Sequence, residues 1–226
     1  FMRDFVVCNY NEVAPLPSSV DDYHALCIET VGIAENICER LNLTAGQKVA
    51  VIGGDFTGNI IAQTLQYRKV TPIVIDNHPE NLKKAAACGV AYAFPNDEAL
   101  IENVKNATSG KMCDAAIYCS SSRLPVTISS RIITKGTAIA IVGLSYNIGS
   151  LDNREIVEND LTVFGVSHVY GYTDAVINML NHNAINLDPL AKRIITDYNP
   201  IELLDERCAS FFIPRRASMT ILKMIF

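Results

Sequence analysis

The sequence predicts an α/β protein in which helices cover both faces of a doubly wound parallel sheet. Short apolar runs alternate along the chain with segments of helical periodicity, which is typical of repeated strand–helix–strand units. The apolar runs are continuous rather than alternating with polar residues, as expected for strands that are buried on both faces. The chain has 226 residues, 49% hydrophobic and 19% charged, which is enough for one large or two small domains.

Charge and cysteine content limit the partners and the compartment. The net charge of −5 argues against a nucleic acid or an anionic membrane surface as a partner. No apolar run reaches the length of a membrane span, and no secretory signal is recognisable. The seven cysteines are scattered and form no C-x-x-C, which predicts free thiols in a reducing cytoplasm.

The clearest strand–helix–strand unit runs from Lys48 to Asp76. Its first strand is Val49–Ile52, its turn is Gly53–Gly58, and its second strand is Ile73–Ile75. Apolar residues at helical spacing lie between the turn and the second strand. The turn therefore lies where a dinucleotide-binding fold places its phosphate-binding loop.

Two glycines of this turn match the first and last glycines of G-x-G-x-x-G. Gly53 permits the tight turn, and Gly58 lets the helix pack closely on the strand. The helix N-terminus offers N–H groups to a pyrophosphate. Asp76 lies at the position where an acidic residue binds the ribose hydroxyls of NAD and repels the extra phosphate of NADP. The candidate cofactor-binding residues are Gly53, Gly54, Asp55, Phe56, Thr57, Gly58, Asp76, Asn77, Ser120 and Gly143.

Asp55 departs from the motif because it takes the place of the middle glycine. That glycine normally lets the backbone approach the pyrophosphate, whereas an aspartate adds a side chain and a negative charge. Two readings stay open. Either NAD binds weakly, or the unit binds no nucleotide and Asp55 caps the helix of a retired phosphate loop.

One long helix is predicted near the start of the chain. Ser18 and Ser19 are its candidate caps, and apolar residues at helical spacing continue to about Leu41. Leu26 belongs to this apolar stripe, which predicts that it is buried. Residues 5–7 form a short apolar strand upstream of the helix.

Strands and helices continue to alternate after the central unit. Pro79 fits the first turn of the next helix, and Gly89 fits its left-handed stop. Further strands are predicted at residues 91–94, 114–118, 137–142, 161–166, 194–195 and 220–222, and helices at 81–88, 97–106, 125–133, 173–180 and 201–207.

Several short motifs, taken in order, resemble the cofactor-binding half of the medium-chain dehydrogenases/reductases, the superfamily of zinc-type alcohol and polyol dehydrogenases. The motifs are Val13–Pro17, Leu43–Val49, Val74–Asp76 with Leu82–Ala85 and Cys88–Val90, Lys135–Thr137 with Ile141–Gly143, Leu187–Leu190, and Met219–Leu222. They cover nearly the whole chain.

The resemblance implies a Rossmann domain at residues 19–190. Residues 1–18 are expected to be a remnant of the β-rich N-terminal catalytic domain, and residues 191–226 to return to that remnant. The implied function is the NAD(H)-binding domain of an oxidoreductase that acts on a small alcohol or carbonyl, and the implied assembly is a homodimer through an edge strand near Leu161–Val166. The family's catalytic half is expected to precede Phe1, either removed by truncation or lost in a degraded relative, so this chain alone is expected to be inactive.

Zinc is implied by the resemblance, but its usual ligands are absent from the sequence. Glu29 falls where polyol-type members place a glutamate at or beside the zinc, with Thr30 in place of their proline. The alternative is that Glu29 is a solvated surface carboxylate. The four histidines show no ligand spacing, and no catalytic residue is assigned. The alternative function is a non-catalytic Rossmann module with a binding or oligomerisation role.

Overall fold

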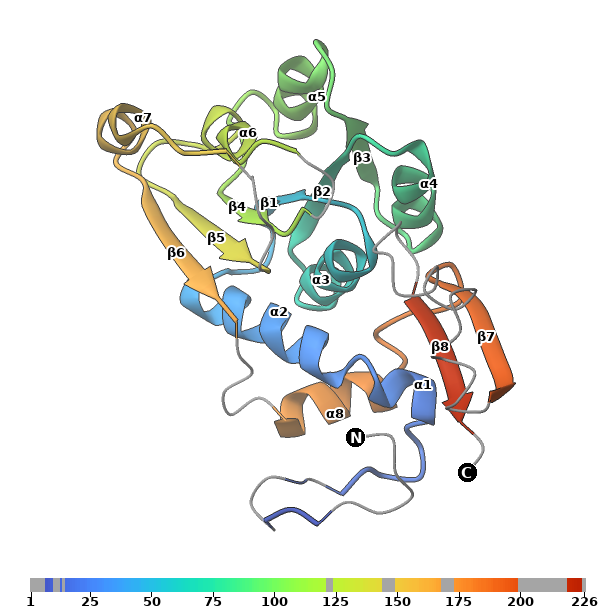
Figure 1. The fold of residues 1–226 in the computed structure, drawn as a ribbon. Coiled ribbons are helices and arrows are strands. Elements are labelled where there is room, and N and C mark those ends of the chain that lie inside the picture. The colour runs from blue at the N-terminus through green and yellow to red at the C-terminus, as the bar shows by residue number, and fades with distance from the viewer. Residues whose placement is uncertain are drawn as a thin grey trace.

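A computed structural model describes residues 7–9, 13, 15–120, 124–143, 149–167, 173–198 and 219–224. Its main sheet has six parallel strands in the order β3-β2-β1-β4-β5-β6. The strands are β1 (Lys48–Ile52), β2 (Thr71–Asp76), β3 (Tyr92–Pro95), β4 (Ala115–Tyr118), β5 (Ala138–Val142) and β6 (Thr162–Val166). This is the doubly wound order, and the strand order reverses between β1 and β4 (Figure 1). The predicted fold class is confirmed.

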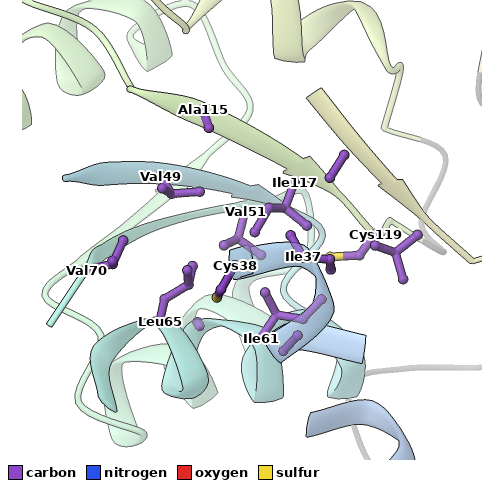
Figure 2. Close-up of a cluster of buried hydrophobic side chains, with 14 of the residues drawn as sticks. Ile37, Cys38, Val49, Val51, Ile61, Leu65, Val70, Ala115, Ile117 and Cys119 are labelled. Carbon is purple, nitrogen blue, oxygen red and sulfur yellow. The ribbon is translucent and has the colours of Figure 1, made fainter. Parts of the chain in front are cut away.

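Helices cover both faces of this sheet. The helices α2 (Ile28–Arg40), α3 (Phe56–Tyr67) and α4 (Pro79–Ala87) pack on one face, and α5 (Leu100–Ala107) and α6 (Thr127–Arg131) pack on the other. Val49 and Val51 of β1 point toward the first set of helices, while Ala50 and Ile52 point toward the second. Figure 2 shows Val51 between the strands and Ile61 of α3. These four side chains of β1 are fully buried, which explains the continuous apolar run in the sequence.

The first predicted helix is wrong in its start and in its continuity. Its cap is Asp21, whose Oδ1 accepts from the backbone N–H groups of Tyr23 and His24 at 2.9 Å each. Ser19 instead donates its hydroxyl to Asn181 Oδ1 at 2.7 Å. The chain forms α1 (Asp22–Ala25) and then restarts as α2 at Ile28. The break shifts the helical phase, so Leu26 is 56% exposed rather than buried.

The ends of α4 agree with the prediction. Pro79 is its first residue, where the missing N–H needs no partner. Gly89 has a φ of +83° directly after the helix, which is the left-handed conformation that glycine adopts without strain. The short helix α7 (Asn153–Glu158), capped by Asp152, was not predicted.

The C-terminal part adds one helix and a second sheet. Figure 1 shows α8 (Thr173–Asn181) lying along α2, and the two share an apolar cluster with Val31 and Met179. The strands β7 (Ala191–Tyr198) and β8 (Met219–Met224) form a separate parallel pair, which confirms and lengthens the two predicted strands. The strand predicted at 5–7 and the helix predicted at 201–207 lie outside the described residues, apart from residue 7. Among the helices that the structure describes, none is long and apolar enough to cross a membrane.

The strand β6 lies at the edge of the main sheet, as predicted. The guanidinium of Arg40, in the last turn of α2, lies 4.1 Å from the centre of the Phe164 ring. Arg40 Nη1 also donates to the carbonyl of Gly165 at 2.7 Å. The end of α2 is therefore attached to the edge strand by a cation–π contact and a hydrogen bond.

Candidate functional site

The turn between β1 and α3 lies at the carboxyl edge of the sheet, beside the start of the loop that follows β4. Gly53 has a φ of +108°, and a Cβ there would lie 2.6 Å from the Cα of Ser120. A Cβ at Gly58 would overlap the carbonyl oxygen of Gly53. Only glycine fits at either position, so the close approach of the helix to the strand that the motif predicts is present in the structure.

Asp55 is the N-cap of α3. Its Oδ1 accepts from the backbone N–H of Gly58 at 3.2 Å, and its side chain is half-buried. The N-terminus of a helix is favourable for an anion because of its free N–H groups and its dipole. In this chain a carboxylate of the protein itself lies at that position.

Asp76 ends β2 and is completely buried. Its Oδ2 accepts from Gly54 N–H at 2.7 Å and from Asn81 Nδ2 at 2.9 Å, and its Oδ1 accepts from His78 N–H at 2.7 Å. Asn77 is exposed at the same strand end. The carboxylate thus points into the turn, and the binding of ribose by Asp76 stays a prediction.

Sequence reasoning missed Asn59 and Asn81, two buried amides beside the turn. Asn59 Nδ2 donates to the carbonyls of Gly54 at 2.6 Å and Asp55 at 3.2 Å, while its Oδ1 is buried with no hydrogen-bond partner. A polar residue directly before the apolar pair Ile60-Ile61 was the available signal. Buried amides of this kind hold backbone groups that no helix or strand ladder satisfies.

Ser120 and Cys119 follow β4 and pack against Gly53 of the turn. Ser120 is 2% exposed, and Cys119 Sγ lies 3.4 Å from the carbonyl oxygen of Gly53. Burial raises the pKa of the Cys119 thiol well above its ordinary value, and the charges of Asp55 and Asp76 raise it further. Cys119 is therefore a neutral thiol that packs under the turn.

A cleft of about 720 Å³ opens beside the turn, where β5 and β6 end. Its lining combines the predicted residues Glu29, Thr57 and Gly143, and Thr57 belongs to the first turn of α3. The remaining lining residues are Thr30, Ile33, Ile141, Val142, Gly165, Val166 and Ser167. An apolar lining with a few polar groups, at the carboxyl edge of a parallel sheet, is typical of a small-molecule site.

The residues of the turn and the cleft differ in how well they fit a metal ion and a dinucleotide. In the described part of the chain, no group of three or more His, Cys, Asp or Glu side chains could hold a metal ion, so the exposed Glu29 is at most one ligand. The glycine positions and the cleft fit a dinucleotide. The Asp55 carboxylate at the N-terminus of α3 opposes the pyrophosphate of that dinucleotide.

Comparisons with known proteins agree with this fold. A zinc-type alcohol dehydrogenase-like protein of Haemophilus influenzae is 24% identical over 182 residues, which are 80% of this chain and 52% of that protein. An (R,R)-butanediol dehydrogenase of Neisseria gonorrhoeae is 23% identical over 188 residues, 82% of this chain and 53% of that protein. The chain thus spans about half the length of these relatives.

A solved structure gives the same result for the fold. The structure is described as a short-chain alcohol dehydrogenase of Escherichia coli CFT073, complexed with NADH. It superposes with a TM-score of 0.76 at 22% identity, and the match covers 93% of this chain and 62% of that one.

A family model described as zinc-binding dehydrogenase matches residues 56–182, more than half of the chain. With the doubly wound sheet and the glycine turn in place, this match confirms the resemblance drawn from the sequence: the chain belongs to the zinc-binding dehydrogenase family.

Proposed function

We propose that this chain is the NAD(H)-binding domain of an oxidoreductase that transfers hydride between a nicotinamide and a small alcohol or carbonyl. The observation that carries the proposal is the junction at Thr57, which belongs both to the helix start after the glycine turn and to the lining of the cleft. The N-terminus of α3 would hold the pyrophosphate of the dinucleotide, and the cleft residues would hold its reacting ring. Relatives named as butanediol and zinc-type alcohol dehydrogenases support an alcohol substrate.

In this proposal the cofactor supplies the hydride chemistry, and the protein binds and orients it. The turn at Gly53 and Gly58 would hold the pyrophosphate, and Ile141 and Val166 would provide an apolar wall beside the reacting ring. Residues 19–190 form the cofactor domain, while residues 1–18 and 191–226 belong to the catalytic domain. Glu29 is the one candidate zinc ligand in the described part of this chain, so the chain alone is expected to show no zinc-dependent alcohol oxidation.

Asp55 is expected to weaken dinucleotide binding. Two like unit charges about 4 Å apart repel by about 4 kcal/mol at an effective dielectric constant of about 20. Each loss of about 1.4 kcal/mol lowers affinity tenfold. Removing the Asp55 charge should therefore strengthen NADH binding by at least about tenfold.

Calorimetric titration with NADH tests the proposal. Asp55→Gly is expected to bind NADH at least about tenfold more tightly than the wild type. Asp55→Asn distinguishes the effect of the negative charge from that of the side-chain volume, because the amide removes the charge but keeps the side chain and its capping oxygen. Asp152→Gly is the matched control, since it removes the aspartate cap of α7, whose Oδ1 accepts from Arg154 N–H at 2.9 Å. It should leave NADH affinity unchanged.

The second candidate function is a non-catalytic Rossmann module. Asp55 favours it, because the helix N-terminus that would bind phosphate already has a carboxylate cap. If neither the wild type nor Asp55→Gly binds NADH, this second candidate replaces the first.

We also propose that the protein is a cytoplasmic homodimer formed through β6. Thr162 N–H donates to Thr137 O at 3.0 Å, so the backbone groups of Thr162 face β5 and those of Val163 face outward. Proline is tolerated in an edge strand where its nitrogen faces solvent. Val163→Pro should therefore keep the fold and halve the mass measured by light scattering. A wild type of monomer mass would refute the dimer.

A further inference from the structure

Three buried polar side chains surround the glycine turn without facing the cleft. Asp76 and Asn59 are 0% exposed and Asn81 is 2% exposed. They come from the end of β2, the first turn of α3 and the first turn of α4. Buried polar groups are retained where their hydrogen bonds are satisfied, so their partners show what they hold in place.

Asp76 and Asn59 share a partner, the backbone of Gly54, while Asn81 donates to Asp76. The N–H of Gly54 donates to Asp76 Oδ2 at 2.7 Å, and its carbonyl accepts from Asn59 Nδ2 at 2.6 Å. A Cβ on Gly54 would lie 3.4 Å from the Cβ of Asp76 and 3.5 Å from that of Asn81. Gly54 is therefore packed against Asp76 and Asn81, and its N–H and its carbonyl are bonded by Asp76 and Asn59.

The carboxylate of Asp76 has little access to a ligand. Three donors reach it, from Gly54, His78 and Asn81, and none of its surface is exposed. The bond from His78 N–H turns the chain at the tip of β2, where Asn77 is the first exposed residue after the buried Asp76 and His78 is exposed next to it. The exposed Asn77 is thus more accessible to a hydroxyl from solvent than the buried carboxylate of Asp76.

We infer that Asp76 is a positioning residue that holds the Gly53-Gly54 turn to β2 and α4, and that Asn77 provides the contact to the adenosine ribose. The first part depends only on contacts within the protein. The second part rests on the proposed dinucleotide function. The inference separates the residue that shapes the phosphate turn from the residue that meets the cofactor.

Amide hydrogen exchange of the nucleotide-free chain tests the first part. In the wild type the Gly54 amide should be as protected as the Gly53 amide, which donates to Ile75 O at 2.9 Å. In Asp76→Asn the exchange of Gly54 should accelerate at least tenfold while that of Gly53 stays unchanged. An unprotected Gly54 in the wild type overturns the inference even if the variant does not fold.

A cycle of binding measurements tests the second part. NADH and its 2′-deoxyadenosine analogue are titrated into the wild type, Asp76→Asn and Asn77→Ala. The affinity lost with the 2′-hydroxyl should be the same in wild type and Asp76→Asn, and absent in Asn77→Ala. Loss of the hydroxyl effect in Asp76→Asn, or its full retention in Asn77→Ala, overturns the inference. If NADH binds to none of the three, the proposed function and the ribose contact of Asn77 both fail, while hydrogen exchange still decides the role of Asp76.

Discussion

The buried Glu35 of α2 and the partly exposed Arg68, which caps the end of α3, form an ion pair on one face of the sheet. Arg68 Nε lies 3.0 Å from Glu35 Oε1, and Arg68 Nη2 donates to Oε2. Glu35 is 3% exposed. The hydrogen bond to Glu35 raises the pKa of the Arg68 guanidinium above its ordinary value.

Glu35→Gln is expected to destabilise the protein by about 1.5–3 kcal/mol, because the Arg68 charge loses its carboxylate partner while a third of its side chain stays exposed to water. The free energy of unfolding in urea measures this effect. The control is Glu80→Gln, which removes the exposed pair with Lys83 at 3.1 Å and should change stability by less than about 1 kcal/mol. Equal effects of the two substitutions would contradict the prediction.

Gly58→Ala is expected to damage the turn itself. The added Cβ overlaps the carbonyl oxygen of Gly53, so α3 must move away from β1. Overpacking of this kind costs about 1–3 kcal/mol, and it should also remove any NADH binding. Gly165→Ala is the control, since a Cβ there meets nothing within 4 Å and its φ is not positive. Thermal unfolding compares the two, and an unchanged melting temperature for Gly58→Ala would show that the helix has room to shift.

Cofactor preference is expected to follow the charge at the tip of β2. A carboxylate at Asp76 opposes a second phosphate on the ribose even without touching it, because Coulomb repulsion acts over several ångströms. NADH should bind more tightly than NADPH in paired titrations, and Asn77→Arg should reduce that preference by adding a positive charge at the exposed position. Tighter binding of NADPH by the wild type would exclude the prediction.

The buried cysteines are expected to react slowly with alkylating reagents at pH 8. Burial raises the pKa of Cys27 to about 11 and of Cys38 and Cys113 to about 12, so few thiolates are present. The exposed Cys8 should be alkylated first, as read by mass spectrometry of peptides.

The same pKa shifts predict a loss of stability in alkali. The unfolded thiols lose their protons near pH 9, below the pKa values of the folded state. The unfolded state therefore binds fewer protons above that pH, and stability should fall as pH rises from about 9 to 12. A melting temperature that is constant over this range would contradict the assignment.

The sheet was predictable from sequence because its strands are buried on both faces. The continuous apolar run Val49–Ile52 is typical of a strand that is buried on both faces, and the glycines at 53 and 58 mark the turn that follows it. The break between α1 and α2 was not predictable, because no glycine or proline lies at Leu26-Cys27 and the apolar spacing continues across it.

The site was predictable in position but not in its contacts. Sequence spacing placed Asp76 at the strand end, but the direction of its carboxylate depends on Asn81, five residues away on another element. In the same way Glu29, Thr57 and Gly143 meet in one cleft only because β5 ends, and α2 and α3 begin, at the same edge of the sheet.

The contact of Arg40 with β6 has a consequence for aggregation. The segment Thr162–Val166 is short, apolar and free of charge, which is the composition that favours uncontrolled addition of strands at a sheet edge. Its outward-facing backbone groups belong to Val163 and Gly165, and Arg40 already occupies the carbonyl of Gly165. A positive charge from a distant helix thus limits strand addition at Gly165, so that the proposed dimer would form its backbone contacts at Val163; the strand sequence alone does not reveal this restriction.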